Sequence, residues 1–585
     1  MRRAAMALAP LCVFGCSAED DVLLTDDGSG LELLFAPLSA DGCQPPVSGA
    51  GQFPAGVESM FVRISGYPNG PPFGASIKPE NLDKGKVLVG GVPPGDGLSL
   101  EIFACEGGAA TWTAKVAQFS VIPNAKVSPT LYLTRRDAMS CTGAGSAPGA
   151  DLATELERPR AFPALGITAE GRALIVGGFD RYAVKADGPE VDATSESAPI
   201  LEYFPSRGLF YTWPTGLASP RGGAHLVPLE GGARFLVLGG APKATLETDP
   251  PLEIAPDSVP AVEVVDATNR TVSASSLGLG VTPLAGVAWN ATGTAIVVTG
   301  GRQSSGFPSN RIQHTTGTPQ SLVDGTVTIV EDKTLGTPRM GHSATWLPGD
   351  RVAIIGGNTN VDAGQFIELL SPSFEATPVA TTGLPSDFES FGLHSTALVR
   401  SNGDVHVLIV AGGAGLTQAA DDAVPEWRAP FQGPARLFAV TLDAAAATAT
   451  VQSLDAGIAT PSRLRRLFSS LTPTQDGRLV FAGGYNQLGT PANPDDACRL
   501  DAASSGCYLD DVTILNVQGD PGAITISTDA TTVHLGEARF GHGAALLPDG
   551  TLLHLGGLNA VSSDSNTLST AVELYNPPSG DNPCQ

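Results

Sequence analysis

A short apolar stretch followed by two glycines returns seven times after residue 158, and this repeat constrains the fold more than any other feature. Successive copies lie 62, 61, 56, 56, 71 and 73 residues apart. A period of this length indicates one supersecondary unit per repeat, because one unit cannot bury its own apolar face and stacks on its neighbours. The paired glycines are Gly177 and Gly178, Gly239 and Gly240, Gly300 and Gly301, Gly356 and Gly357, Gly412 and Gly413, Gly483 and Gly484, and Gly556 and Gly557.

Other residues keep register with these glycines. An arginine lies seventeen or eighteen residues before the first glycine in five copies, and a histidine lies fourteen before it in three, with a fourth fitting if a longer turn is allowed. Turn signals such as 348–350 then separate two strands, and further apolar stretches follow, as at 366–372. Four antiparallel strands per repeat form one propeller blade. The residues in register are Arg160, Arg221, Arg339, Arg466, Arg539, His225, His342, His394 and His542.

With these elements in place, the chain resembles the kelch family of β-propellers and the galactose-oxidase-like propellers over residues 158–580. The family's tyrosine is clear at Tyr203 and Tyr575, and its tryptophan at Trp213. Units three and five carry Pro283 and Phe391 where the others have arginine. The resemblance implies an all-β fold: a seven-bladed kelch-like propeller at 158–585, preceded by a smaller domain.

The last repeat lacks a fourth strand, because few residues remain after 571–577. An open blade would expose a sheet edge. We therefore predict that residues 150–156, within a linker at 136–157, supply the missing outer strand. Cys141 and Cys584 would then lie close together and could pin the joint.

The first sixteen residues carry an export signal. Arg2 and Arg3 precede a short apolar run, which is too short to span a bilayer as a mature helix. The run ends in a pattern resembling a bacterial lipobox, which predicts a lipoprotein signal peptide at 1–15 and lipid attachment at Cys16. An ordinary secretory signal is the alternative. We expect a lipid-anchored protein of the cell envelope, in the outer membrane or at the cell surface.

Residues 16–30 are expected to be a tether, and 31–135 a small β-sandwich. Short alternating strands at 60–65, 86–92, 98–105, 111–122 and 128–133 are separated by turn-rich segments. This pattern resembles the Ig-like or prealbumin-like modules of exported bacterial proteins.

The number of cysteines is consistent with an exported protein that forms disulfides, since the chain contains eight. Without Cys12 in the signal peptide and Cys16 at the lipid, six remain, which is an even number. Position in the chain suggests Cys43–Cys105, Cys498–Cys507 and Cys141–Cys584, although six cysteines allow fifteen pairings.

The repeat arginines and histidines are expected to be structural, tying strands and blades together. No GxSxG, HExxH or P-loop pattern occurs in a supporting context, and no catalytic residue or metal ligand is assigned. The galactose-oxidase resemblance suggests a copper site, but no converging set of tyrosines, histidines and a free cysteine is seen. An acidic loop is expected to be solvated, with calcium as the alternative. Its residues are Asp495, Asp496, Asp501, Asp510 and Asp511.

The preferred hypothesis is a binding scaffold for a protein or glycan, because no catalytic constellation is evident. Long loops after Gly178, Gly240, Gly301, Gly413 and Gly484 would carry the binding face, including Trp427 and Phe431. A net charge of −25 argues against a nucleic-acid partner. A monomer is expected. The alternatives are a carbohydrate-active oxidase, epimerase or lyase, and a purely structural envelope protein.

Overall fold

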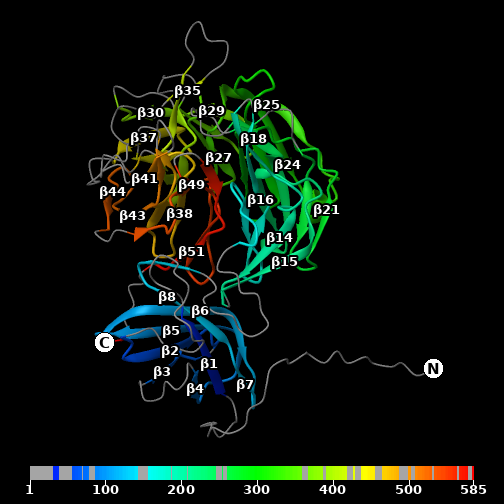
Figure 1. Ribbon diagram of the computed structural model, residues 1–585. Coiled ribbons are helices and arrows are strands. Elements are labelled where there is room, and N and C mark those ends of the chain that lie inside the picture. Colours follow the sequence, from blue (N-terminus) through cyan, green and yellow to red (C-terminus); the bar gives the residue numbers. More distant parts are fainter. Residues whose placement is uncertain are drawn as a thin grey trace, which may run out of the picture.

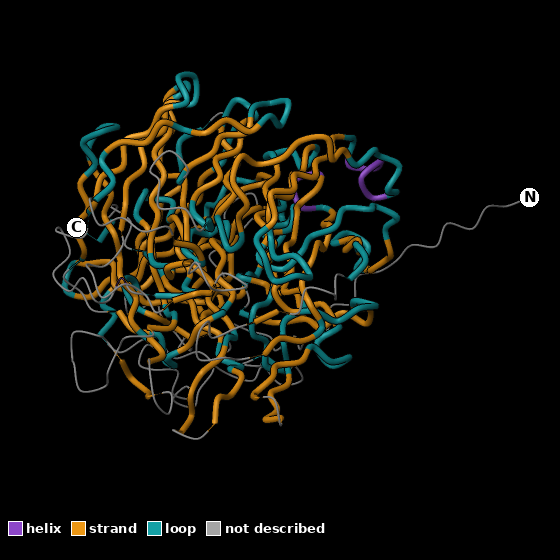
Figure 2. The backbone as a smooth tube through the Cα atoms, turned by 90° about the horizontal axis from the view of Figure 1, so that it is seen from above, coloured by secondary structure: helices purple, strands orange, loops and turns teal. Residues whose placement is uncertain are grey.

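The computed structural model contains two β-rich parts: a ring of sheets and, beside it, a smaller domain built from the N-terminal strands (Figure 1). Strands dominate when the molecule is seen from above, with only short helical segments (Figure 2). The helical segments whose bounds fall within the described residues are α1 (Pro319–Val323) and η2 (Glu230–Gly232). The structure describes residues 30–37, 56–68, 70–77, 86–141, 156–185, 188–206, 208–245, 253–254, 260–358, 366–385, 391–417, 426–428, 437–454, 464, 466–486, 498–501, 507–529, 533–562, 565–577 and 583–584.

The N-terminal domain has eight strands in one hydrogen-bonded sheet of order β3-β2-β5-β6-β8-β1-β4, with β7 beside β1. Only two residue pairs join β6 to β8, so the sheet folds over at that point around one apolar core. Side chains alternate between buried and half-buried along β2, as expected for strands with one face on a core. The bounds are β1 (Gly30–Pro37), β2 (Ser59–Ser65), β3 (Phe73–Ile77), β4 (Lys86–Gly90), β5 (Gly95–Glu106), β6 (Ala109–Val121), β7 (Lys126–Val127) and β8 (Thr130–Arg135).

Among the described residues after 158, seven sheets share one plan of four antiparallel strands, and these form the propeller. The first four sheets are β10 (Ala164–Ile167), β11 (Ala173–Val176), β14 (Pro199–Phe204) and β15 (Leu209–Gly216); β16 (Gly222–Leu229), β17 (Arg234–Ala241), β20 (Glu263–Asp266) and β21 (Thr271–Ala274); β22 (Ala285–Trp289), β23 (Ala295–Gly300), β24 (Ser309–Thr316) and β25 (Val330–Arg339); β26 (Ser343–Leu347), β27 (Arg351–Ile355), β28 (Ile367–Leu370) and β29 (Ala376–Pro378).

The remaining three sheets complete the ring. They are β32 (Ser395–Asn402), β33 (Val405–Ala411), β36 (Leu437–Asp443) and β37 (Thr448–Ser453), with β30 (Ala380–Thr382) added at the edge; β38 (Ser470–Pro473), β39 (Leu479–Ala482), β43 (Asp511–Gln518) and β44 (Thr525–Thr528), with β45 (Val533–His534); and β47 (Gly543–Leu546), β48 (Leu552–Leu555), β51 (Val572–Tyr575) and β9 (Met139–Cys141).

The first strands lie innermost, because at six of the seven junctions the first strand of one blade contacts that of the next, including β10 of the first sheet with β47 of the last. Second strands such as β11 and β27 bury nearly every side chain, since a blade lies on each of their faces. The all-β propeller fold predicted from the repeats is therefore confirmed.

The last blade is completed by β9, which pairs antiparallel with β51 through Cys141 opposite Glu573 and Met139 opposite Tyr575. The prediction that residues 150–156 would fill this position is wrong, although a segment preceding the first blade does close the ring. Closure by β9 leaves little chain between the two domains, because β9 follows β8 directly.

The disulfide prediction also needs correction. Cys105 of β5 is bonded to Cys584, across a sequence separation of 479 residues. Two proposed pairs, Cys43–Cys105 and Cys141–Cys584, are therefore wrong. Cys43 lies outside the described residues. The side chains of Cys498 and Cys507 are not described either, so the third pair, Cys498–Cys507, stays a prediction.

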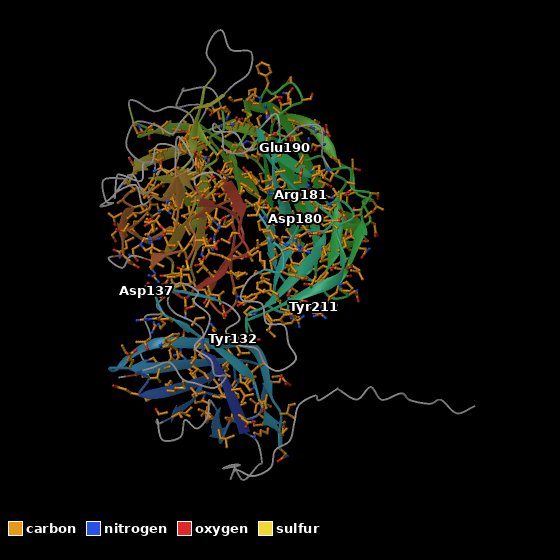
Figure 3. The ribbon with its side chains drawn as sticks, viewed as in Figure 1. Tyr132, Asp137, Asp180, Arg181, Glu190 and Tyr211 are labelled. Carbon is orange, nitrogen blue, oxygen red and sulfur yellow. A yellow bond between two sulfur atoms is a disulfide. The ribbon has the colours of Figure 1, made fainter. Side chains whose placement is uncertain are left out.

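The two domains are held together at the start and end of the propeller. Asn576 Nδ2 donates to Thr134 Oγ1 at 2.7 Å, and Tyr575 Oη donates to an Asp137 carboxylate oxygen at 2.8 Å. Tyr132 of β8 packs with Leu201 and other residues of the first and last blades. Tyr132 and Asp137 both lie at this junction (Figure 3).

Candidate functional site

The paired glycines join each blade to the next. All fourteen glycines have positive φ, the region that favours glycine. In the first repeat, the N–H of Gly178 donates to the carbonyl of Arg221 in the second blade at 2.8 Å, and a Cβ on Gly177 would lie 2.3 Å from the same oxygen. The motif is thus a joint between blades rather than a ligand loop.

The repeat arginines bind their own blade. Arg339 donates to the carbonyl oxygens of Gly356 at 2.6 Å and Phe366 at 3.2 Å, and its guanidinium lies 2.9 Å from a Glu368 oxygen. Burial lowers the pKa of Arg339, while the charge of Glu368 opposes this shift. The same pairing joins Arg221 to Glu263, Arg466 to Asp511 and Arg539 to Glu573. The predicted structural role of the arginines is confirmed.

The acidic partners were missed by the sequence analysis. Their signal is a carboxylate inside or beside the apolar third strand of a blade, as in Glu368 of β28. Asp511, predicted as a binding-loop residue, is one of these partners and is 1% exposed. Asp510 lies 3.3 Å from His534 and is also buried. Neither carboxylate belongs to a solvated loop, because each is buried and lies beside a basic side chain of the propeller.

Three of the four repeat histidines form a second joint between blades. His342 Nε2 lies 2.8 Å from Thr299 Oγ1, His394 Nε2 lies 3.1 Å from Ser343 Oγ, and His542 Nε2 lies 3.0 Å from Ser470 Oγ. In each pair the partner belongs to the preceding blade. Burial lowers the pKa of His342 to about 3 and that of His542 well below its ordinary value, so both stay neutral.

His225 departs from this pattern. It pairs with Leu238, whereas Ala224 pairs with Gly239 and occupies the position that His342 holds in its blade. The hairpin of this blade contains the turn η2, which lengthens it and offsets the count from the glycines. Burial lowers the pKa of His225 to about 4.

The arginine position of the third blade is also corrected. Thr282 occupies this position rather than Pro283, and its hydroxyl donates to Gly300 O at 3.3 Å.

Backbone hydrogen bonds at five of the seven junctions form a belt of linked repeats around the axis. One residue of each repeat, two positions after the arginine, has positive φ, and among the described residues five of these donate their N–H to the carbonyl of the preceding repeat. The last bond closes the belt, from Phe162 N to Gly541 O at 2.6 Å. The belt residues are Phe162, Gly223, Leu284, Gly341, Leu393, Phe468 and Gly541.

An aromatic cluster fills the axis on the side of the glycine loops. Phe162 lies 5.3 Å from Phe468 between ring centroids, and Tyr485 and Tyr508 lie 5.8 and 5.5 Å from Phe540. These rings belong to one apolar cluster drawn from several blades. A 270 Å³ cavity lies where the belt meets the starts of the innermost strands. It is lined by backbone and small side chains together with Phe162, Phe468 and His542.

Loop insertions fold into additional strands on this same side. Residues after Gly178 and Gly240 pair with each other in the sheet β12-β13-β18-β19, which spans two blades. Three smaller sheets, β31-β34-β35, β40-β42-β41 and β46-β49-β50, complete this layer in the described residues. The bounds are β12 (Arg181–Lys185), β13 (Gly188–Asp192), β18 (Lys243–Thr245), β19 (Glu253–Ile254), β31 (Phe391–Gly392), β34 (Ala414–Thr417), β35 (Glu426–Arg428), β40 (Tyr485–Asn486), β41 (Cys498–Asp501), β42 (Cys507–Leu509), β46 (Arg539–Phe540), β49 (Leu558–Ser562) and β50 (Ser565–Leu568). We call this layer the loop face.

The loop predictions are partly corrected. The insertion after Gly301 is a short turn that reaches β24 at Ser309, whereas the loop after Gly557 forms β49 and β50. Trp427 lies in β35 and Asp501 in β41, but their side chains are not described. Phe431, Asp495 and Asp496 lie outside the described residues, so the calcium alternative stays untested.

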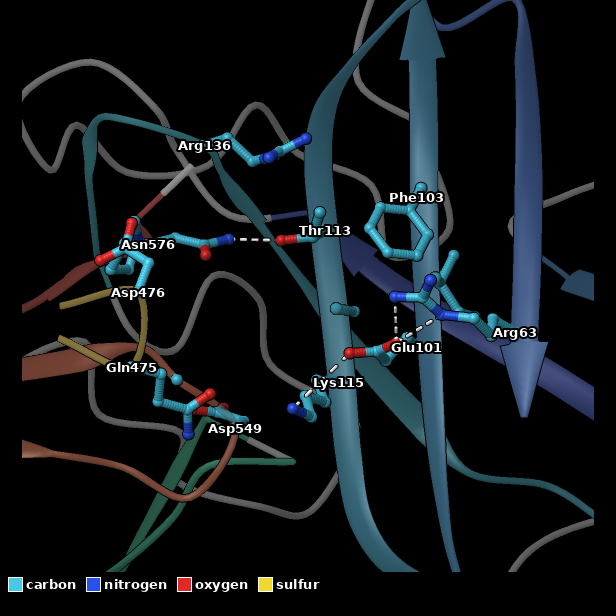
Figure 4. A pocket seen from close by; sticks show the side chains of 14 residues that line it. Arg63, Glu101, Phe103, Thr113, Lys115, Arg136, Gln475, Asp476, Asp549 and Asn576 are labelled. Atoms are coloured by element: carbon cyan, nitrogen blue, oxygen red, sulfur yellow. Dashed lines mark hydrogen bonds and ion pairs between the residues drawn. The ribbon is translucent and has the colours of Figure 1, made fainter. Parts of the chain in front are cut away.

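A pocket of 130 Å³ lies between the N-terminal domain and the hairpins of the sixth and seventh blades (Figure 4). Glu101 bonds Arg63 at 2.6 Å and Lys115 at 3.5 Å on one wall, and Asp549 lies on the other. Burial raises the pKa of Asp549, opposed by hydrogen bonds from Thr551. The volume is below the roughly 300 Å³ at which small-molecule sites begin, so the pocket is a packing gap of the domain junction.

Within the described ranges, no three His, Cys, Asp or Glu side chains are placed to hold a metal ion. In the same ranges, no helix has the length and apolar character needed to cross a bilayer.

Comparison with known proteins gives weak likenesses in structure alone. No family model and no curated protein matches the sequence. The structure of YjhT is 12% identical with a TM-score of 0.35, covering 73% of this chain and 97% of its own. A fungal alcohol oxidase of the AA5 family, in complex with copper, is 14% identical with a TM-score of 0.33, covering 61% and 73%. At these values the matches carry no inference about activity.

Proposed function

We propose that this protein is a lipid-anchored lipoprotein of the cell envelope whose propeller binds a protein or glycan through its loop face. The anchor at Cys16 rests on the sequence alone, since that residue lies outside the described ranges. The single observation that carries the binding role is the sheet β12-β13-β18-β19, in which insertions of two blades pair with each other. Loops ordered on a rigid scaffold are where proteins carry recognition.

The charges on this sheet favour contact with a macromolecule. Arg181, Asp192 and Lys243 lie opposite one another on three adjacent strands, and Arg181 and Lys243 are exposed. Arg181 and Glu190 both lie within the propeller and well apart from the N-terminal domain (Figure 3). Exposed positive charges beside a half-buried carboxylate, all on ordered strands, supply the complementarity that selects a partner.

A carbohydrate-active enzyme is the alternative, and it needs polar groups converging at a pocket. The axis on the loop side holds instead the cluster around Phe540, and the repeat arginines and three of the four repeat histidines are bonded within the ring. Binding by the loop face is therefore the better-supported function.

The test is capture of partners from envelope extracts and on a glycan array by residues 17–585. We expect specific capture, and we expect the double variant Arg181→Glu/Lys243→Glu to reduce it at least tenfold. Asp404→Lys, at an exposed hairpin on the opposite side, is the matched control and should capture normally. Failure to capture any specific partner, or equal capture by the double variant, would refute the loop-face proposal.

A further inference from the structure

A cleft opens between the third and fourth blades, far from the loop face. It lies at the hairpins, where Asn290 and Thr294 come from the third blade and Asp350 from the fourth. Its volume is 330 Å³, within the range of about 300–1,000 Å³ typical of small-ligand sites. Among the cavities described above, it is the one large enough for such a ligand.

Aromatic rings form one wall of the cleft. Trp346, which is half-buried, lies 6.2 Å from Phe374 between ring centroids, in an edge-to-face arrangement. Phe374 also stacks on His314, at 4.1 Å between ring centroids and an interplanar angle of 20°. Phe374 has φ of +61°, a conformation that costs a side-chain-bearing residue roughly 1–2 kcal/mol. The stack holds the ring in place against that cost.

Polar groups also line the cleft, and three of them make no side-chain hydrogen bond to another described residue. Between described residues, no hydrogen bond involves the carboxylate of Asp350, the hydroxyl of Thr316 or the indole N–H of Trp346. Thr294 adds a second hydroxyl, which bonds Asn290 and Thr292 at the rim. The cleft therefore offers one acceptor-only group, one donor-only group and two hydroxyls that can do either.

The aromatic wall, the hydroxyls and the carboxylate of the cleft together indicate which class of ligand fits it. An aromatic face binds a flat apolar surface, while the hydroxyls and the carboxylate match a ligand that carries several hydroxyl groups. Asp350 is the charged residue in the cleft wall, and the chain carries a net charge of −25, so anionic ligands are repelled. We propose that the cleft binds a neutral saccharide of one or two rings, which stacks on Trp346 and donates hydroxyl protons to Asp350.

The saccharide site is separate from the loop face, so it stands whether or not the loop face binds a partner. Residues 17–585 are titrated with cellobiose, maltose, lactose and chitobiose, each up to about 10 mM, by calorimetry and by tryptophan emission. At least one disaccharide is expected to bind and to change the emission. Trp346→Phe should remove the emission change while keeping the packing, and Trp346→Ala should weaken binding at least tenfold.

Two further variants test the chemistry. Asp350→Asn should weaken binding about threefold to tenfold without disturbing the turn, because Asn tolerates the positive φ of 55° at this position. Phe307→Ala changes an exposed aromatic residue in the turn after Gly301 and should bind as the wild type does. No binding of any disaccharide, equal binding by a folded Trp346→Ala protein, or tighter binding of glucuronate than of glucose would overturn the proposal.

Discussion

The carbonyl oxygen of Arg160 accepts a hydrogen bond from the backbone N–H of Gly557 at 2.8 Å, which joins the first repeat to the last. The same bond recurs at five other junctions, always from the second glycine of a pair to the next blade. The first and last parts of the ring are therefore joined at three places: by this bond, by the belt bond from Phe162 to Gly541 at the axis, and by β9 on the outer edge. The glycine pair is thus required by the neighbouring blade as well as by its own positive φ.

Replacing the first glycine of a pair should therefore cost more than replacing a turn glycine of the same conformation. A Cβ on Gly556 would lie 2.0 Å from Arg160 O, with φ of +63°. Gly403 has φ of +57° and open space around its Cβ position. We expect Gly403→Ala to destabilise by about 1–2 kcal/mol and Gly556→Ala by about 4 kcal/mol or more. Thermal melts of both variants test this, and equal shifts would contradict the role of the joint.

The buried arginine pairs should be far more sensitive than surface pairs. Glu368→Gln leaves the Arg339 charge buried without its counter-ion, which is expected to cost about 3–5 kcal/mol. The matched control is Glu331→Gln, whose partner Arg311 is exposed, and this change should cost no more than about 1 kcal/mol. Denaturant unfolding of both variants measures the difference. Similar stabilities would mean that the Arg339 pair contributes no more than a surface contact.

Local patterns predicted the blades well, because each repeat carries its own strands, turns and glycines. The second strands and the five arginines lie where the sequence placed them, since both follow from local residue patterns within one repeat. The outer strands are less regular: in the third blade α1 follows the third strand, and the outer strand β25 begins only at Val330. A weakly patterned outer strand gives a local signal that tertiary pairing overrides.

Features that depend on two distant segments were not predictable in this way. The short strand β9 has no distinctive pattern, and its place is decided by the free edge of β51. The partner of Cys105 follows from how the N-terminal domain docks, not from distance along the chain. The saccharide cleft combines hairpins of two repeats, so neither Trp346 nor Asp350 stands out in its own repeat.

Disulfide mapping provides a direct test of the domain docking. Proteolysis of the oxidised protein should release a linked pair of peptides containing Cys105 and Cys584. In the chain-entropy model a loop of this length contributes about 6 kcal/mol as an upper value, so Cys584→Ser should lower the melting temperature. Peptides linking Cys43 to Cys105, or Cys141 to Cys584, would instead restore the pairing expected from the sequence.

The proposed anchor can be examined without the structure. Cells expressing the full chain and fed a radioactive fatty acid should incorporate label, and Cys16→Ala should abolish it. Cys12→Ala is the control, because that residue would be removed with the signal peptide. Label retained in the Cys16→Ala protein, or none in the wild type, would exclude lipid attachment at this cysteine.

Acid sensitivity should follow from the buried histidines, and His554 gives the clearest case. It is fully buried in β48, and neither ring nitrogen has a hydrogen-bond partner among the described residues. Burial lowers its pKa to about 3, below the value of about 6.5 expected in the unfolded chain. Between these values the unfolded state binds more protons, so the stability from His554 is full above pH 6.5 and falls as the pH falls.

His554→Leu should remove this dependence. Because the leucine leaves no unsatisfied polar group, stability at pH 7 should be unchanged or higher. The loss of stability between pH 7 and pH 5 should shrink by about 2 kcal/mol relative to the wild type. His542, whose ring centroid lies 5.5 Å away, keeps its lowered pKa because burial is the main cause. Unfolding measured at both pH values decides the matter, and an unchanged difference would show that His554 titrates normally in the folded protein.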